Sequence, residues 1–424
     1  MKAIFALLFF STSLIISAQN TLKQDIINIE DKLIEWRHHF HQNPELSNRE
    51  FKTAEKIAEH LKSLGLDVET GIAKTGVVAL LKGDHPGKVV ALRADIDALP
   101  VTERNDLPFK SEVRTTFLNT ETGVMHACGH DTHIAILMAT AEVLSKHKDK
   151  INGTIKFIFQ PAEEGPPPGE EGGAKLMIKE GVLENPKVDA IFGLHINSQT
   201  PVGTIKYKTG GIMASVERFV IDVKGKQTHG SQPWSGVDPI LISAKIIDGL
   251  QTIISREAKL TDEAAVITVG KITAGTRFNI IPESAEMIGT VRTLDPNMRT
   301  MIEKRMKEMT ETIANAYGGE ATITFQNNTA ITYNDPDLTE QVLPSLQKVA
   351  GEENVELMKA TTGGEDFSYF QEVVPGVYFF LGGMTPGSVE SYPHHTPDFK
   401  IDDSGMLLGV KAFTQLTLDY LNNQ

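Results

Sequence analysis

The chain has 424 residues, of which 40% are apolar and 23% charged, and its formal net charge is −14. This length is too great for one ordinary hydrophobic core and predicts two domains, while the glycine and proline content suits a loop-rich α/β enzyme. The negative charge, with no basic patch in the sequence, argues against nucleic acid or an anionic membrane as partner. A small molecule is therefore the expected ligand.

The first 18 residues predict a secretory signal peptide. Lys2 precedes an apolar run, and the small residues of Ile16-Ser17-Ala18 offer a cleavage site. The apolar run is short and polar residues interrupt it, which argues against a membrane anchor. We therefore expect an exported protein, periplasmic or secreted. The only cysteine, Cys128, cannot form an internal disulfide, so in an oxidising compartment it must be buried or bound to a metal.

The first part of the mature chain predicts an α/β domain. Apolar residues at helical spacing indicate helices over 22–40 and 52–64, and strand-like runs follow them. Three of these runs end in polar residues: "KVVALRADIDALP" in Asp95 and Asp97, "GTIKFIFQPAEEG" in Glu163 and Glu164, and "VDAIFGLHI" on His195. In parallel α/β sheets the ligand site lies at the carboxyl ends of the strands. The sequence therefore predicts a functional site at this edge of a sheet.

A second domain is predicted within the first. Between Arg218 and Phe325 the pattern reads strand, helix, two strands, helix and strand. This βαββαβ order is the ferredoxin-like arrangement, which we interpret as an inserted domain over 212–330. Afterwards "GVYFFLGGM" resumes a buried strand, and a helix from Met406 to Tyr420 would complete the first domain. The first domain is thus expected to comprise 19–211 and 331–424.

The stretch "VMHACGHDTH" raises the question of what Cys128 does. With His126 and His130 nearby it could be a nucleophile with its base. The other interpretation is a metal site with five candidate ligands: Cys128, His130, Glu164, His195, and either His394 or His395. Thiolate, imidazole and carboxylate together suit zinc or a similar borderline metal. Five ligands exceed what one tetrahedral ion needs, and two ions that share a bridging ligand would use them better.

Nine motifs in chain order resemble those of the metallo-amidohydrolase and carboxypeptidase family that contains aminoacylases, hippurate hydrolases and auxin-conjugate hydrolases. They are "LRADIDALP", "MHACGHDTH", "QPAEEG", "GLH", "THGSQPWSGVDP", "FNIIPESA", "GTVRTLD", "TGGEDFSYF" and "HHTPDF". The likeness covers nearly the whole mature chain. It implies an α/β fold with a zinc-peptidase-like catalytic domain, built on a mostly parallel central sheet. It also implies that the inserted α+β domain is a lid and dimerisation domain in a homodimer.

The resemblance also implies roles for single residues. Two divalent metal ions, either zinc or one of manganese, cobalt and nickel, would bind to Cys128 as the bridge and to His130, Glu164, His195 and His395. His395 fits the family's His-x-Pro pattern better than His394. Glu163 would be the general base and Asp97 an orienting residue, while Asp95, which stands where many relatives have a histidine ligand, is left unassigned. Beyond the metal ligands, the implied groups are His229 as oxyanion stabiliser, Asn279 and Arg292 as receptors of the substrate carboxylate, and Glu365 and Asp366 without a settled role.

The expected function is therefore that of an exported, metal-dependent amidohydrolase. It would cleave the amide bond of N-acyl-L-amino acids, of the hippurate or N-acetyl type, by metal-activated water with Glu163 as general base. A dipeptidase or carboxypeptidase of the same mechanism is one alternative. A protein that binds a metal or an amino acid without turnover is another, and the intact Glu163-Glu164 pair favours an enzyme over it.

Overall fold

The structure is a computed structural model that describes residues 21–388 and 390–422, so the predicted signal peptide lies outside the described residues. The chain divides into two compact units. The first takes in Met1–Lys208, Asn334–Met358 and Phe370–Gln424, and the second takes in Thr209–Tyr333 and Lys359–Tyr369. The second unit therefore includes Lys359–Tyr369, which the sequence pattern had placed in the first domain. Within the described residues, no helix has the length and apolar character needed to cross a membrane.

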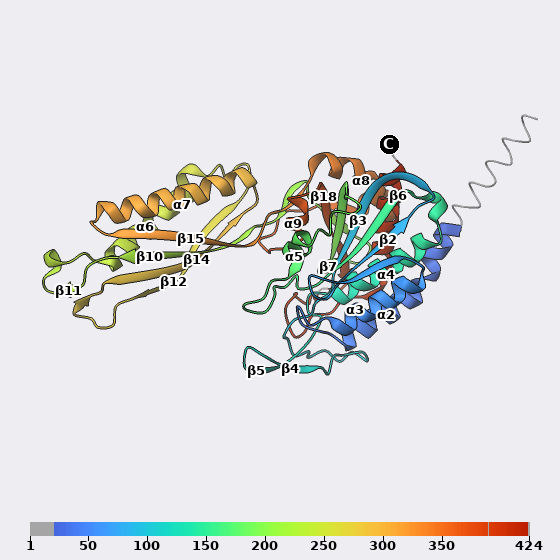
Figure 1. The fold of residues 1–424 in the computed structure, drawn as a ribbon, viewed down its shortest axis with the longest axis horizontal. Coiled ribbons are helices and arrows are strands. Elements are labelled where there is room, and N and C mark those ends of the chain that lie inside the picture. Colours follow the sequence, from blue (N-terminus) through green and yellow to red (C-terminus); the bar gives the residue numbers. More distant parts are fainter. Residues whose placement is uncertain (1–20, 389, 423–424) are drawn as a thin grey trace, which may run out of the picture. The chain divides into compact units, whose positions relative to one another are not determined.

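A mixed sheet of eight strands forms the centre of the first unit (Figure 1). Its spatial order is β1 (Asp67–Ile72), β2 (Gly76–Lys82), β6 (Asn152–Gln160), β3 (His85–Asp95), β7 (Ala190–Pro201), β18 (Gly376–Met384), β8 (Ile205–Tyr207) and β17 (Val355–Leu357). The four central strands, from β6 to β18, are parallel to one another. Their carboxyl ends consequently lie along one edge of the sheet, as the sequence pattern requires.

Helices complete the first unit. They are α2 (Glu30–Gln42), α3 (Phe51–Ser63), α4 (His130–Ser145), α5 (Gly173–Lys179), α8 (Pro336–Ala350) and α10 (Met406–Asn422), while the short α9 (Ser368–Gln371) begins in the segment of the second unit and ends in that of the first. Almost every residue of α4 is buried, and both α4 and α10 pack on β3 at the centre of the sheet. One continuous apolar core joins these helices to the central strands. Helix α4, which begins at His130, is therefore held rigidly beneath the edge where the strands end.

Several short elements lie outside these layers. A hairpin is formed by β4 (Arg114–Phe117) and β5 (Thr120–Gly123), and β9 (Gly210–Met213) pairs with β16 (Thr332–Asn334). Single helical turns cover Lys148–Lys150, Pro233–Ser235, Ile253–Glu257, Glu352–Asn354 and Asp403–Gly405.

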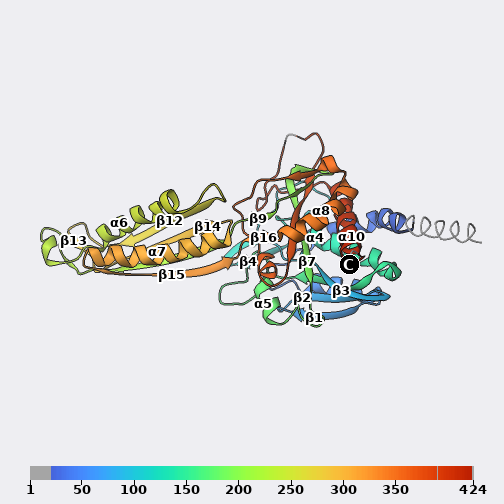
Figure 2. The same cartoon turned by 90° about the horizontal axis from the view of Figure 1, so that it is seen from above.

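The second unit contains an antiparallel sheet of four strands with the spatial order β12 (Ala265–Ala274), β14 (Ser284–Thr293), β10 (Val216–Lys224) and β15 (Glu320–Thr329). Helices α6 (Pro239–Thr252) and α7 (Pro296–Ala316) pack on each other and on this sheet (Figure 2). Each helix begins with proline after an aspartate, and the carboxylates of Asp238 and Asp295 accept hydrogen bonds from the first free backbone N–H groups. In chain order these elements read βαββαβ. A small ribbon of β11 (Thr228–His229) and β13 (Ile280–Ile281) extends from this unit.

One predicted strand is longer than its sequence pattern suggested. The expected strand finished at His195, whereas β7 continues to Pro201 because β18 pairs with it along this extension. The other neighbour, β3, pairs with β7 only as far as Gly193. His195 is therefore held in a regular strand but lies just beyond the last residue paired with β3, at the edge where the site was expected.

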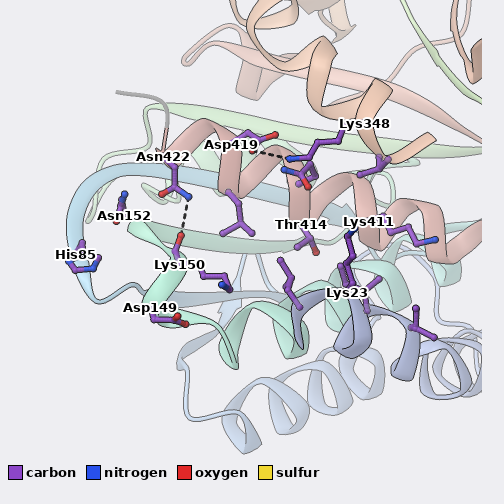
Figure 3. A pocket seen from close by; sticks show the side chains of 16 residues that line it. Lys23, His85, Asp149, Lys150, Asn152, Lys348, Lys411, Thr414, Asp419 and Asn422 are labelled. Carbon is purple, nitrogen blue, oxygen red and sulfur yellow. Dashed lines mark hydrogen bonds and ion pairs between the residues drawn. The ribbon is translucent and has the colours of Figure 1, made fainter. Parts of the chain in front are cut away.

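A large cavity lies at the opposite edge of the same sheet (Figure 3). It measures about 1030 Å³, and His85 and Asn152, which begin β3 and β6, line it together with residues of α10. The amino ends of these strands carry none of the predicted site residues. This cavity is therefore separate from the predicted site.

Candidate metal centre

Gly129 positions the two ligand candidates on either side of it. Its φ of +93° is left-handed, and it precedes the first residue of α4. A Cβ atom there would lie 2.4 Å from Cγ2 of Ile196 and 3.3 Å from Cζ of Phe399. Only glycine satisfies both the backbone conformation and the lack of space. The tight turn directs Cys128 and His130 toward the same point.

The two glutamates follow a turn of unusual conformation at the end of β6. Ala162 has a φ of +53°, which a residue with a side chain rarely adopts, and its N–H donates to Oε1 of Glu50 at 2.9 Å. The Glu50 carboxyl group is fully buried, and Oγ1 of Thr75 donates to it at 2.6 Å. Since the left-handed residue breaks the strand, Glu163 and Glu164 no longer alternate across a sheet. Both can then face the site.

His130 presents one ring nitrogen to the centre of the site. Its Nδ1 lies 2.9 Å from the carbonyl oxygen of Asp97 and 3.2 Å from the Oδ1 of that residue, so it carries the proton and donates. Its Nε2 is buried and has no hydrogen-bond partner among the described residues. The Asp97 carboxylate is held in turn by Oγ of Ser47 at 2.7 Å and by the N–H of Glu164 at 3.0 Å. A histidine that binds a metal through one ring nitrogen usually donates the N–H of its other ring nitrogen to a carboxylate in this way.

Cys128 lies at the centre of the candidate ligands. Its Sγ is 3.4 Å from Nε2 of His195 and 3.2 Å from Nε2 of His395, and the latter nitrogen is 3.1 Å from Oε1 of Glu164. Ligand atoms of Cys128, His130 and Glu164 also lie within 4.8 Å of one another. Nitrogen and sulfur bound tetrahedrally to one zinc ion would lie about 3.5 Å apart. The donor set and its spacing therefore fit divalent metal, with the thiolate shared between two ligand groups.

Hydrogen bonds distinguish the two neighbouring histidines. Nε2 of His394 accepts the N–H of Ser198 at 3.3 Å, so Nδ1 carries the proton and faces the carbonyl oxygen of Cys128 at 3.1 Å. The same Nδ1 lies 3.8 Å from Sγ of Cys128. By contrast, the backbone N–H of His395 donates to Ala127, which holds its Nε2 against Cys128 and Glu164. Ligand atoms of Cys128, His195 and His394 also lie within 4.8 Å of one another, so both histidines reach the thiol, and His395 as the last ligand stays a prediction.

Asp95 and His133 form a contact that the sequence analysis missed. The Asp95 carboxylate accepts hydrogen bonds from Nη1 of Arg93 and from Nδ1 of His133, each at 2.6 Å. Nε2 of His133 accepts a hydrogen bond from the backbone N–H of Ile196 at 2.8 Å. Both ring nitrogens of His133 are therefore hydrogen-bonded, so they are not free to bind a metal although His133 lies close to His130. This contact fixes the strand residue that follows His195. The only signal in the sequence was the i, i+3 spacing of His130 and His133 on one helix.

The electrostatics of the buried site suit a cation better than a free thiol nucleophile. Burial raises the pKa of the Cys128 thiol well above its usual value, and the charge of Glu164 raises it further. Burial lowers the pKa of His195 well below its usual value, so this ring is neutral and its Nε2 can donate a lone pair. A thiol with a raised pKa is a poor nucleophile, whereas coordination to a cation deprotonates it.

Three predicted residues, His229, Asn279 and Arg292, belong to the second unit. His229 is exposed, and its Nδ1 accepts from N–H and Oγ of Ser231 at 3.1 and 2.7 Å. Its Nε2 therefore carries the proton and is a donor, as an oxyanion stabiliser requires. Asn279 adjoins it, because its carbonyl oxygen accepts the N–H of Gly230 at 2.9 Å.

Arg292 does not join this pair within one chain. It lies near the far end of β14, which begins at Ser284, just after the ribbon beside His229. Eight residues of strand place it about 26 Å from Ser284, since a strand rises about 3.3 Å per residue. Asn279 and Arg292 of one chain therefore lie too far apart to bind the same carboxylate, and their role as its receptors stays a prediction. Glu365 and Asp366 also belong to the second unit, and both are buried.

The chain is similar to known hydrolases over nearly its whole length. The chain is 42% identical over 403 residues to thermostable carboxypeptidase 2 of Saccharolobus solfataricus, covering 95% of this chain and 98% of the relative. It is 38% identical over 392 residues to N-acetyl-L-cysteine deacetylase of Bacillus subtilis, covering 91% and 89%.

A solved structure also matches the whole fold. The Bacillus subtilis YXEP protein, described as a dinuclear metal-binding peptidase of the M20 family, superposes with a TM-score of 0.77 and 36% identity over 94% of this chain and 99% of that one. Residues 91–419 match the family model described as Peptidase family M20/M25/M40. The resemblance inferred from the nine motifs is confirmed: the chain belongs to Peptidase family M20/M25/M40.

Proposed function

We propose that this metal-dependent hydrolase removes the acyl group from N-acyl-L-amino acids of the N-benzoyl or N-acetyl type. The observation that carries the proposal is the convergence of the Cys128 thiol with imidazole nitrogens and the Glu164 carboxylate, with Glu163 3.9 Å from Nε2 of His130. The likeness to the deacetylase supports an acyl-amino-acid substrate. The likeness to the carboxypeptidase supports the second candidate, a dipeptidase or carboxypeptidase that acts by the same chemistry.

Two divalent ions would be held by five residues: Cys128, His130, Glu164, His195 and His395. The mixture of one thiolate, carboxylate and imidazole suits zinc, manganese, cobalt or nickel. When bound, such ions supply the Lewis acidity that activates water and polarises the amide carbonyl. The dinuclear metal-binding relative of the same family supports this assignment.

Glu163 is the proton carrier of the proposed reaction. One of its carboxylate oxygens lies 3.9 Å from Nε2 of His130, and the side chain is only 10% exposed. From this position it can take a proton from the attacking water and return it to the leaving amine. The adjacent Glu164 lies 3.1 Å from His395 and serves as a ligand instead.

A homodimer would resolve the separation of the carboxylate receptors within the second unit. In the proposed dimer, His229 and Asn279 of one chain contribute to the site of the other. The edge strand β12 supports the proposal, because Val266 and Ile272 on it are 46% and 49% exposed. Exposed apolar side chains on an unpaired edge strand favour pairing with another chain. The second unit would then act as both lid and dimerisation domain.

We place the mature protein outside the cytoplasm, in the periplasm or the medium. The charged start, apolar run and small-residue cleavage site of residues 1–18 support this. Determining the amino-terminal sequence of the exported protein tests it: cleavage after Ala18 is expected, and an intact amino terminus in the cytoplasm would contradict export.

The reaction is tested by incubating the purified mature protein, after its metal content is measured, with N-acetyl amino acids, N-benzoyl amino acids and dipeptides. Release of the free amino acid from the acylated substrates is expected. Turnover of dipeptides alone would favour the second candidate. Failure to hydrolyse any substrate with the metals bound would favour a binding protein.

The dimer is tested by mixing two inactive variants, His229→Ala and Glu163→Gln. If His229 acts on the site of the other chain, a mixed dimer contains one site with both groups intact, and part of the activity returns. Confirmed subunit exchange without activity would mean that each chain completes its own site by domain closure.

A further inference from the structure

The cavity of about 1030 Å³ at the amino ends of β3 and β6 is built entirely from the first unit. Its walls come from the helical stretch 21–28, from α8 and from α10 (Figure 3). The stretch 21–28 is fixed to the rest of the unit, because Ile26 is buried in the apolar core and Oδ2 of Asp25 lies 2.8 Å from Nε2 of His147. Pockets that bind small organic molecules measure about 300–1000 Å³, so this cavity is large enough for one.

The charges that line the cavity favour an anion. Lys348 lies 4.0 Å from Asp419, so these two charges offset each other. Three further lysines line the cavity without an ion-pair partner among the described residues, and they are Lys23, Lys150 and Lys411. Asp149 is the only other acid that lines it. The cavity therefore carries an excess of positive charge in a chain whose formal net charge is −14.

A buried hydroxyl group in the same cavity also lacks a partner. Thr414 projects from α10 into the cavity and is only 2% exposed, and its Oγ1 has no hydrogen-bond partner among the described residues (Figure 3). Buried polar groups in folded proteins are nearly always hydrogen-bonded, and a helical threonine often donates to the carbonyl four residues earlier. A ligand oxygen in the cavity would satisfy this hydroxyl group. The observation is independent of the lysines and also indicates an acceptor.

Apolar side chains form much of the remaining wall, and they are Leu22, Ile26, Ile27, Val349 and Leu418. Ile27 is 52% exposed, so an occupant with an apolar part would remove apolar surface from water. A small inorganic anion would leave this surface uncovered. A membrane rich in anionic lipid is disfavoured as the occupant, because the net charge of the chain would repel it. The wall therefore suits one molecule that has both an anionic end and an alkyl chain.

We propose that this cavity binds a single-chain amphiphile with an anionic headgroup, such as a long-chain carboxylate, at a site separate from the metal centre. Lys411, Thr414 and Leu418 lie three and four positions apart on α10 and so share one face of the helix. The headgroup would contact Lys411 and the hydroxyl group of Thr414 on this face, and Lys23 from the stretch 21–28. The alkyl chain would cover Leu418 and Ile27. The site does not depend on the reaction at the metal centre.

The test is isothermal titration of the metal-loaded protein with dodecanoate, below its micelle concentration, with octanoate and dodecyltrimethylammonium for comparison. We expect one dodecanoate per chain, bound about tenfold or more tighter than octanoate because each buried methylene adds affinity. The cationic amphiphile should not bind. Equal affinity for dodecanoate and octanoate, or for the anionic and cationic amphiphiles, would overturn the proposal. So would loss of dodecanoate binding after the metals are removed with a chelator, because it would place the ligand at the metal centre.

Two pairs of variants locate the binding. Thr414→Val and Lys411→Gln should each weaken dodecanoate binding about tenfold, since each removes a hydrogen bond to a charged group. The control for the first is Thr417→Val, whose buried hydroxyl group also lacks a partner among the described residues but lies outside the cavity. The control for the second is Lys56→Gln, a half-buried lysine on α3 outside the cavity.

All four variants should keep the unchanged kcat/KM for amide hydrolysis, which also shows that they fold. Unchanged affinity in both Thr414→Val and Lys411→Gln would overturn the proposal, as would equal losses in the two controls. Binding to vesicles of anionic phospholipid without binding to dodecanoate would assign the cavity to a membrane surface and overturn it as well.

Discussion

Replacing Gly129 by alanine should damage both the fold and the metal centre. The left-handed backbone costs a residue with a side chain about 1–2 kcal/mol. The added Cβ would lie 2.4 Å from Cγ2 of Ile196, deep in the core, and such overpacking costs about 1–3 kcal/mol more. We therefore expect the free energy of unfolding to fall by about 2–5 kcal/mol. Because Gly129 separates Cys128 from His130, the same shift should weaken metal binding.

Urea denaturation with a chelator present, followed by circular dichroism, measures the steric part without the contribution of bound metal. The matched control is Gly169→Ala: its φ of +84° is similar, but no atom lies within 4 Å of the added Cβ. That variant should lose only about 1–2 kcal/mol, from its backbone conformation. Equal losses in the two variants, or unchanged metal affinity in Gly129→Ala, would refute the reasoning.

Other substitutions separate the roles of neighbouring groups. Glu163→Gln should keep the metals and lower kcat about 10²- to 10⁴-fold. Glu164→Gln should instead lower the metal content. Equal loss of metal in both variants would contradict the assignment. His395→Ala should lower metal content more than His394→Ala, as elemental analysis can show. Lys156→Met should lower the free energy of unfolding by about 3–5 kcal/mol, because the buried ammonium donates to three backbone carbonyls at 2.7–3.0 Å. Urea denaturation measures this change, and an unchanged midpoint would contradict the prediction.

The edge of the sheet that carries the site could be predicted from the sequence. Apolar runs that end in Asp95, Glu163 or His195 indicate where a buried strand reaches the surface of the sheet layer. In a parallel sheet the carboxyl ends of such strands lie side by side. The extension of β7 could not be predicted, since it depends on pairing with β18, which lies far along the chain.

The contacts of the adjacent histidines were also beyond the sequence, although the His-x-Pro pattern had favoured His395. One of these contacts comes from the N–H of Ser198, which is 196 positions away from His394. Similarly, Asn279 and Arg292 are close in the sequence, and only the extended strand between them shows that they lie at opposite ends of the sheet. Local patterns specify strands and their polar ends, whereas hydrogen bonds between distant segments decide which side chains meet.

The metal content of Cys128→Ser tests the central claim most directly, because Cys128 is the group that both sets of ligands share. Elemental analysis of the purified proteins, with activity measured on the same samples, should find two divalent ions per unchanged chain. The serine variant should hold fewer ions and show reduced activity that depends on added metal and not on reductant. Two ions per chain and full activity in Cys128→Ser would contradict the account.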